Sequence, residues 1–317
     1  MKASTKTINV AIWMYQNDNG RVPLNALRTK LEEKGANVFS EFDLRTCYAL
    51  NGKVYTASGV NLSKFDFLFH MNADEQSDHQ RDMLKAIEEG GTAVLNDCST
   101  FFACQDKFVM NNMLRSAGIN VPESLLFCKS IDQSILKNIL HRWRSWLIKP
   151  RKGHGAKGIV KFCDCEQFID FIEAMTDDNS GYYIEQFIEF GERDFRVEIF
   201  NENVIGGYSR IKSHDFKTNI SAGGRMAPSE MGPEVEIALN AAKALGVTGT
   251  IVDMVKGIND HQFYVLEVNP TLGIFVESAM MAGTRMPPQK AHESYAYDDA
   301  KVDEIVKYIF RPEICKS

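Results

Sequence analysis

Short apolar runs alternate with amphipathic stretches along the first hundred residues. Runs typical of β-strands are expected at four places: residues 8–14, 38–42, 65–70 and 92–96. Between them, apolar residues recur at helical spacing in 22–34 and 77–89, and a glycine follows each stretch. This alternation of strands and helices predicts a small open parallel α/β sheet, which we assign to residues 1–100.

The remainder of the chain continues with mixed elements. Helices are expected at 105–117, 131–143, 166–175, 229–245, 274–286 and 300–311. Strands are expected at 121–127, 145–149, 159–162, 182–188, 195–200 and 204–210. A chain with this many elements suits two or three α/β modules.

The segment 249–273 carries the clearest chemical pattern. Two apolar runs flank a polar turn at Gly257–His261, which predicts a β-hairpin in a buried sheet. Asp253 lies in one run, and Glu267 and Asn269 lie in the other, although buried carboxylates are costly unless they are paired. Because residues two apart share a face of a strand, the hairpin brings three oxygen-bearing side chains together. They suit Mg²⁺ beside nucleotide phosphates; the alternative is a solvated sheet face.

A glycine-rich segment, Arg151–Gly158, connects two predicted strands. Gly153, Gly155 and Gly158 match G-x-G-x-x-G, but a β-branched strand follows, whereas a Rossmann fingerprint opens into a helix. Ile159-Val160 also stands where a Walker A loop has Lys-Ser/Thr. The strand–loop–strand context predicts a flexible flap whose backbone N–H groups approach phosphate oxygens. The alternative is a glycine-rich hairpin turn.

Polar residues at the ends of the first-sheet strands are candidate substrate contacts, because ligands bind beyond the carboxyl ends of parallel strands. They are His70, Asn72, Asp74 and Asn96. For each one taken singly, an ordinary polar loop residue is the favoured interpretation. The polar loop 214–224 adds Lys217, Asn219 and Gly223-Gly224 as candidates for phosphate or substrate contact.

Composition and charge narrow the class of protein. The 317 residues are 44% hydrophobic and 25% charged, which is enough apolar material for a packed core. A net charge of −6 argues against nucleic acid as the main partner, whereas a small anion such as ATP needs only a local basic site. The N-terminus reads as a strand rather than a signal peptide, and no run approaches the ~20 apolar residues of a membrane span. Seven cysteines without framework spacing indicate reduced thiols and a cytoplasmic protein.

Taken in order, seven segments resemble those of the ATP-grasp superfamily, most closely the RimK-like carboxylate–amine ligases and glutathione-synthetase-like enzymes. They are Cys104–Phe108, Leu147–Lys149 with Gly153–Gly158, Tyr183–Ile188, Asp194–Arg196, Asp215–Asn219 with Gly223-Gly224, Gly249–Asp253 and Leu266–Asn269. The resemblance covers roughly residues 60–280 and implies an α/β ATP-grasp fold. In that fold the small N-terminal parallel α/β domain precedes two α+β subdomains that sandwich the nucleotide. We assign these to residues 101–185, with the flap, and 186–317, with the metal site.

The resemblance implies a nucleotide site built from both subdomains. Lys107 and Lys149 would hold the ATP phosphates, with the flap glycines above them. The adenine slot would be lined by one strand and two flanking side chains: Glu185, Gln186, Phe187, Ile188, Ile148 and Leu266. Glu192 or Asp194 would hold the ribose.

The resemblance also implies catalytic and metal roles. Arg196 and Arg210 would balance the charge of the phosphoryl group and of a substrate carboxylate. Asn219 would touch phosphate or the acyl intermediate. Two Mg²⁺ ions, with Mn²⁺ as the alternative cation, would be bound by Asp253, Glu267 and Asn269.

The function so implied is an ATP-dependent carboxylate–amine ligase. The γ-phosphoryl group would pass to a carboxylate, and an amine would attack the acylphosphate to give an amide, ADP and phosphate. The carboxylate and amine would come from an amino acid, a small peptide or a peptide terminus, without a nucleic-acid or membrane partner; a homo-oligomer is left open. The alternatives are an ATP-grasp kinase acting on a small polyol or sugar phosphate, and a non-catalytic ATP-binding protein. Residues 65–100 hold only two cations, Arg81 and Lys85, which disfavours a phosphorylated substrate.

Three positions depart from the usual family pattern, and all concern the acceptor side. Asn269 is followed by Pro-Thr-Leu-Gly273 where Asn-x-Ser-Pro-Gly is common. Ala222 precedes the glycine pair where arginine is frequent, and His70 ends a strand where a RimK-like enzyme tends to carry arginine. ATP binding is therefore a firmer expectation than any particular substrate.

Overall fold

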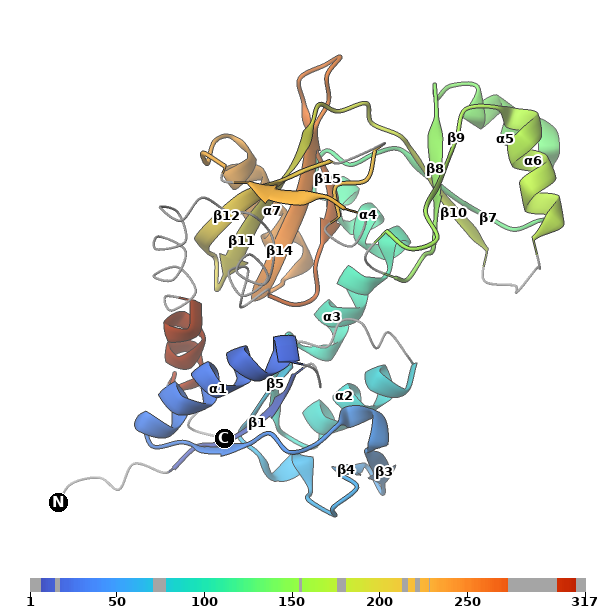
Figure 1. Cartoon of the computed structure of the whole chain (residues 1–317). Coiled ribbons are helices and arrows are strands. Elements are labelled where there is room, and N and C mark those ends of the chain that lie inside the picture. Colours follow the sequence, from blue (N-terminus) through green and yellow to red (C-terminus); the bar gives the residue numbers. More distant parts are fainter. Residues whose placement is uncertain are drawn as a thin grey trace.

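The computed structural model describes residues 7–14, 18–70, 78–153, 156–175, 181–212, 216–219, 223–227, 229–272 and 301–311. These residues form three larger sheets and a small hairpin. The first sheet and its helices lie at one end of the molecule, a five-stranded sheet lies above them, and a central four-stranded sheet lies to the side (Figure 1).

The first sheet is parallel, which confirms the prediction from strand–helix alternation. In order across the sheet, its strands are β2 (Asn37–Phe39), β1 (Asn9–Trp13), β5 (Phe67–His70) and β6 (Ala93–Leu95). Val10 and Ile12 of β1 pack on one face and Ala11 and Trp13 on the other, so both faces are buried. Helix α1 (Asp18–Glu33) covers the first face and α2 (Asp78–Glu89) covers the second.

A hairpin that we did not predict lies between β2 and β5 along the chain. It pairs β3 (Tyr48–Leu50) with β4 (Lys53–Tyr55), flanked by the 3₁₀ turns η1 (Leu44–Thr46) and η2 (Leu62–Lys64). Asn51 and Gly52 form its turn with φ of 51° and 73°. An Asn-Gly pair with two positive φ angles is the sequence signal of a tight hairpin, so the signal was present.

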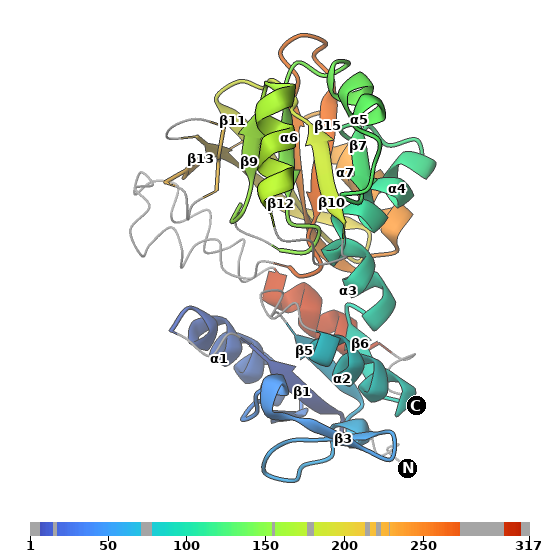
Figure 2. The same ribbon diagram turned by 90° about the vertical axis from the view of Figure 1, so that its right-hand side faces the viewer.

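The helical segment 301–309 packs on the first sheet, although the predicted division grouped it with residues 186–317. Its apolar residues Val302, Ile305, Val306 and Ile309 share a core with Val10 and Ile12 because this face of the parallel sheet is only partly covered by α1. Figures 1 and 2 show the segment in dark red between the first sheet and the five-stranded sheet. Lys301 at its start forms a fully buried ion pair with Glu198.

The central sheet is antiparallel and carries helices on one face. In order, its strands are β7 (Ser124–Phe127), β10 (Tyr182–Gln186), β8 (Trp146–Lys149) and β9 (Val160–Phe162). Helices α5 (Gln133–Leu140) and α6 (Cys165–Ala174) pack on Trp146, Ile148 and Ile184. β10 runs across the predicted boundary between residues 185 and 186.

The five-stranded sheet is antiparallel as well. In order, its strands are β13 (Arg225–Ala227), β12 (Asn203–Ile211), β11 (Arg193–Phe200), β14 (Gly249–Lys256) and β15 (Phe263–Val268). One face packs on α4 (Lys107–Ser116) and α7 (Glu234–Leu245) through residues such as Val197, Val252 and Val265. The opposite face carries the charged residues of the candidate site, because side chains alternate along each strand.

The helices near this sheet differ from the prediction in their ends. The predicted helix 105–117 begins at Lys107, because Asp106 caps it by accepting from the N–H groups of Phe108 and Val109. A separate helix, α3 (Cys98–Gln105), precedes it. The predicted helix 229–245 begins at Glu234, after Pro233, and the predicted helix 274–286 lies outside the described residues. Among the described helices, none combines the length and apolar content that a bilayer crossing requires.

Candidate active site

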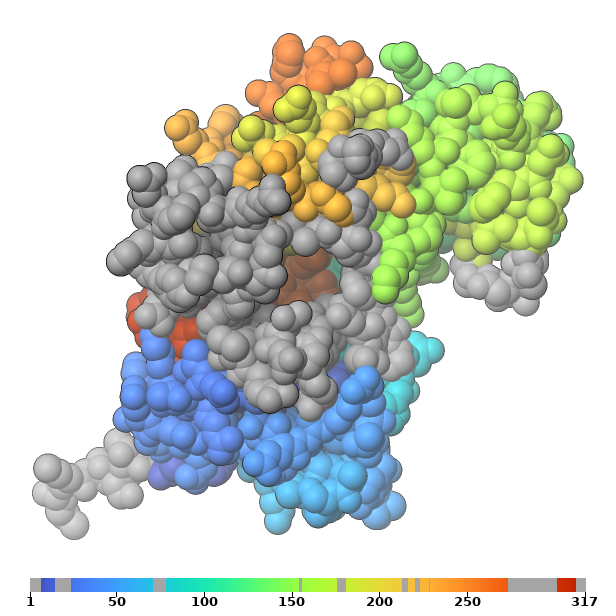
Figure 3. All heavy atoms as spheres, viewed as in Figure 1, coloured from blue at the N-terminus to red at the C-terminus, as the bar shows by residue number. Residues whose placement is uncertain are grey.

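A cavity lies between the central sheet and the five-stranded sheet, and most of the predicted nucleotide residues line it. The predicted residues in its wall are Lys107, Lys149, Gly153, Glu185, Gln186, Phe187, Ile188, Asp194, Arg210, Asn219, Asp253, Leu266 and Glu267. Figure 3 shows the two contributing units side by side, the central one in green and the other in yellow and orange. Arg196 and Asn269 are not among the lining residues, but both donate hydrogen bonds to Asp253, which is.

The remaining predicted residues lie elsewhere. Gly158 and the exposed Glu192 are outside the set that lines the cavity, and Gly155 lies outside the described residues. The prediction for Ile148 was wrong, because this side chain packs in the helix-covered core of the central sheet. Its neighbour Leu147 faces the cavity instead. Strand alternation explains the difference: Lys149 faces the cavity, so only residues two away share its side.

A buried ion pair lies in the floor of the cavity. Lys149 on β8 donates to Glu185 on β10, and both side chains are less than a tenth exposed. The hydroxyl of Tyr183 donates to the other oxygen of Glu185 at 2.7 Å. Burial and the charge of Glu185 raise the pKa of Tyr183 far above its usual value, so the phenol stays protonated and keeps donating. These contacts pair two largely buried charges and hold Lys149 towards the cavity.

The glycine-rich segment connects two antiparallel strands, β8 and β9, which confirms the predicted strand–loop–strand context. Gly153 and Gly158 have φ of 140° and 71°, and a Cβ on Gly158 would lie 2.9 Å from Pro150 Cγ. Lys107 Nζ donates to the carbonyl of Gly153 at 2.6 Å and lies 3.6 Å from Glu267 Oε1. One cation therefore connects the flap to the carboxylate of the other sheet.

A charged network covers the cavity face of the five-stranded sheet. Arg196 Nη2 donates to Asp253 Oδ2 at 2.5 Å, and Arg210 Nη2 donates to the same oxygen at 3.0 Å. Arg210 also forks onto Asp194. Burial lowers the pKa of Arg196, but Asp253, Tyr208 and Asp194 together raise it by more, and the pKa lies well above the ordinary value. The Arg196 guanidinium therefore stays charged beside the Asp253 carboxylate.

Asp194 is occupied by protein donors. Its oxygens accept from Arg210 Nε and from Thr218 Oγ1, the latter at 2.6 Å. This leaves Asp194 little capacity for ribose hydroxyls unless the loop that carries Thr218 moves. The hydrogen bond instead fastens the predicted phosphate loop to β11, which places Lys217 and Asn219 in the cavity wall.

The predicted hairpin of residues 249–273 is confirmed for strands β14 and β15, and it places Asp253 directly opposite Glu267. Just past the end of β15, the side-chain amide of Asn269 donates to Ile251 O at 2.7 Å and to Asp253 Oδ1 at 3.2 Å. The donor set is two carboxylates and one amide oxygen, which fits Mg²⁺. Among the described residues, no group of three or more His, Cys, Asp or Glu side chains is placed to hold a metal ion, so a site at this position would have to include the Asn269 amide.

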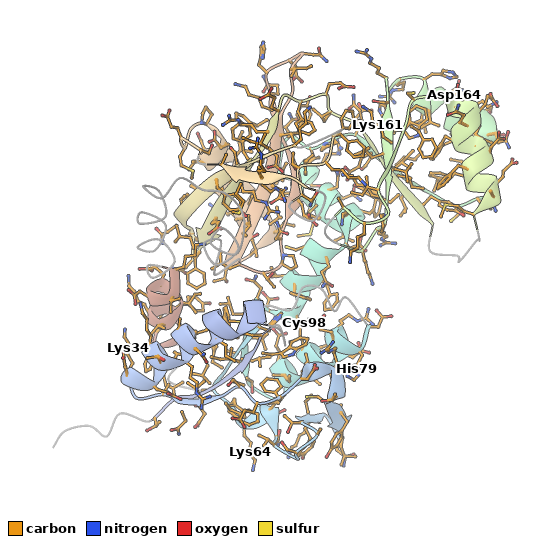
Figure 4. All side chains as sticks on the ribbon, in the orientation of Figure 1. Lys34, Lys64, His79, Cys98, Lys161 and Asp164 are labelled. Carbon is orange, nitrogen blue, oxygen red and sulfur yellow. The ribbon has the colours of Figure 1, made fainter. Side chains whose placement is uncertain are left out.

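Several contributors were not predicted. Tyr208 accepts from Arg196 Nη1 at 3.0 Å, and it lies two residues before Arg210 on the same strand face, which the strand period could have revealed. Phe187 is contacted from two directions: the Phe216 ring lies 5.6 Å away and Lys161 Nζ lies 3.6 Å above it. Figure 4 labels Lys161 on the side of the central sheet nearer the five-stranded sheet. The two contacts of Phe187 join residues that are distant in the sequence, so no local pattern could have indicated them.

Two candidate substrate contacts of the first sheet, His70 and Asn96, do not line the cavity. His70 is buried against the Phe101 ring, with its Nε2 3.4 Å from the carbonyl of Asn96. Burial lowers the pKa of His70 to about 4, so the ring is neutral at pH 7. The side chain of Asn96 is buried and fully bonded to backbone groups of the five-stranded sheet, so it is no substrate contact. Asn72 and Asp74 lie outside the described residues.

Comparison with known proteins agrees with this geometry. The chain is 28% identical over 195 residues to a probable α-L-glutamate ligase of Haemophilus influenzae, a match that covers 61% of this chain and 63% of that protein. It therefore spans less than two thirds of that relative. A RimK domain ATP-grasp protein of Sphaerobacter thermophilus superposes with a TM-score of 0.67 at 14% identity, covering 96% of this chain and all of the other.

A second solved structure includes ligands. The ATP-grasp ligase PsnB, complexed with a minimal precursor, Mg and ADP, superposes with a TM-score of 0.61 at 18% identity, covering 94% of this chain and 99% of the other. These structural likenesses establish the shared fold. The model of the RimK-like ATP-grasp domain matches residues 104–286, which is more than half of the chain. The chain therefore belongs to the RimK-like ATP-grasp family.

Proposed function

We propose that this protein is an ATP-dependent carboxylate–amine ligase that forms an amide through an acylphosphate and releases ADP and phosphate. The observation that carries the proposal is the convergence of Lys107, Arg210, Asp253 and Glu267 in the wall of one cavity between two sheets. A triphosphate needs such cations, and a divalent ion bound with it would need such carboxylates.

The nucleotide would lie across the two sheets. Backbone groups of Gln186 to Ile188 would meet the adenine edge, with Leu147 and Leu266 on either side of the ring. Lys149 would exchange its contact with Glu185 for a phosphate oxygen, and the flap would close above it. Glu192 or Asp194 would bind the ribose, and Asp194 would do so after Thr218 releases it.

The metal site would be made by Asp253, Glu267 and Asn269. Two bound Mg²⁺ ions, or Mn²⁺ in their place, would neutralise phosphate charge as the γ-phosphoryl group leaves. Arg196, Arg210 and Lys107 lie against the same carboxylates and offset their negative charge before nucleotide arrives. These ion pairs would keep the carboxylates neutralised in the free protein, and the metal ions would do so once nucleotide is bound.

The chain's own residues would position the acyl group and exclude water. Arg196 and Arg210 would hold the substrate carboxylate in line with the γ-phosphate, and Asn219 would donate to the phosphoryl or acyl oxygen. The loop that carries Lys217 and Asn219, together with the flap, would shield the acylphosphate from hydrolysis.

The substrates proposed are an amino acid, a small peptide or a peptide terminus. The support is indirect: one relative is named as a glutamate ligase, and PsnB was solved with a precursor. The cysteines of the described residues, Cys47, Cys98, Cys104, Cys128, Cys163 and Cys165, are free thiols, which supports a cytoplasmic location. The net charge of −6 supports a small partner rather than nucleic acid.

The test is to incubate the protein with ATP, Mg²⁺ and pooled amino acids and short peptides, then to follow phosphate release and product mass. Phosphate release that depends on the amine, with an amide product, supports the ligase. A phosphorylated product without an amide would replace the proposal with the kinase alternative. Nucleotide binding without turnover on any pool would favour the non-catalytic alternative.

A further inference from the structure

The side chain of Asn96 connects the first sheet to the five-stranded sheet, through residues that are far apart in the sequence. It follows β6 of the first sheet and is 4% exposed. Its Oδ1 accepts from the N–H groups of Thr248 and Gly249, both at 3.0 Å, and its Nδ2 donates to the carbonyls of Gly249 and Pro270, both at 2.7 Å. The amide makes four hydrogen bonds to backbone, so its geometry is fully determined.

The backbone groups that Asn96 holds flank the proposed metal ligands. Gly249 opens β14, the strand that carries Asp253, and Pro270 directly follows Asn269. β14 is also held by β11 and β15, but Asn269 lies beyond the end of β15. There the backbone is held by Asn269 N donating to Ile251 O, by Thr250 Oγ1 donating to Asn269 O, and by Asn96.

We infer that Asn96 is a positioning residue that sets the separation of Asp253 and Asn269 and thereby tunes divalent-cation binding with the nucleotide. The inference rests on the proposed metal role of these two residues. One amide reaches both segments, so a change at residue 96 moves the start of β14 relative to the end of the hairpin. Groups that orient metal ligands typically alter metal affinity 10- to 100-fold when they are removed.

The test compares Asn96→Ala and Asn96→Asp with two controls. Asn96→Asp keeps the acceptor for Thr248 and Gly249 but turns a carboxylate oxygen towards two carbonyls. It should therefore not restore the metal-dependent ADP affinity that Asn96→Ala loses. Asn120→Ala removes an amide that donates to Phe263 O at the opposite end of the same hairpin. Ile305→Ala opens the core next to the first sheet and lowers stability while keeping the Asn96 side chain and its hydrogen-bond partners.

The readout is the affinity of ADP measured by calorimetry with Mg²⁺ and again with EDTA, on variants shown by circular dichroism to be folded. The dissociation constant with EDTA, divided by the dissociation constant with Mg²⁺, reports how much the metal contributes to ADP affinity. We expect both Asn96 variants to lower this ratio about tenfold, while Asn120→Ala and Ile305→Ala keep the wild-type ratio.

A wild-type ratio in Asn96→Ala would overturn the inference. An equal loss in Ile305→Ala would overturn it as well, because the effect would then follow stability alone. If wild-type protein binds ADP equally well with and without Mg²⁺, the metal assignment of the proposed function fails, and the inference falls with it. The wild-type measurement therefore separates the two failures.

Discussion

Asp253 and Glu267 lie directly opposite each other on two antiparallel strands, and a cationic side chain contacts each of them. Two carboxylates on directly opposite residues of paired strands repel one another unless cations lie beside them. In this structure Arg196 and Lys107 supply the charge, one from β11 and one from the start of α4. The arrangement explains how an acidic pair persists in a largely buried wall.

Glu267→Gln should leave the fold intact and remove most of the turnover. Glutamine keeps the shape and the packing of the side chain but removes the charge proposed to hold the metal. We expect kcat to fall at least about 100-fold, measured by phosphate release at saturating ATP. Glu166→Gln, which removes a carboxylate from an exposed pair with Lys137, is the matched control and should keep full activity. Unchanged turnover in Glu267→Gln would remove this residue from the metal site.

The pair Lys149–Glu185 should show strong coupling in stability. Lys149→Met leaves the Glu185 carboxylate buried without its cation, which typically costs about 3–5 kcal/mol. Replacing both, as Lys149→Met with Glu185→Gln, should recover most of that loss. Urea denaturation of the two single variants, the double variant and the wild type completes the cycle. Additive losses would mean that the two side chains do not depend on each other.

His70 should make stability depend on pH. Its folded pKa is lowered by burial from 6.5 to about 4, so below pH 6.5 the unfolded chain takes up a proton that the folded protein does not. This contribution is fully present above pH 6.5 and is lost as the pH falls towards 4, by about 3 kcal/mol. Urea denaturation between pH 7 and 4 measures it. His70→Leu should remove this part of the slope, whereas His79→Gln, at an exposed position on α2 (Figure 4), should retain it.

Gly224→Ala should disturb the loop that carries Lys217 and Asn219. A Cβ at residue 224 would lie 1.9 Å from Thr218 O and 3.0 Å from Asn219 O, so the loop must shift. A displacement of about 1 Å in a positioning group costs on the order of 100-fold in rate, and we expect a loss of that size in kcat. Gly191→Ala is the control, because its Cβ meets nothing within 4 Å. Comparable kinetics for the two variants would argue that the loop plays no part in positioning substrates.

Much of the site could be predicted from local pattern. The apolar runs around Asp253 and Glu267, with a polar turn between them, predict the hairpin and the cross-strand pairing, because strand period and turn position set the register. The glycine segment between β8 and β9 was predicted for the same reason. Where the period was ignored the prediction failed: Ile148 cannot share the face of Lys149, and Leu147 lines the cavity instead.

What the sequence by itself determined is therefore periodicity: which segments are strands or helices, which residues share a face, and which buried runs carry charge. The tertiary structure alone decided how separate segments meet. Asn96 bonds to Gly249, 153 residues away, and the helical segment 301–309 completes the core of the first sheet. Neither contact leaves a mark in the local pattern, because a buried amide or an apolar helix face finds its partner only when whole sheets pack together.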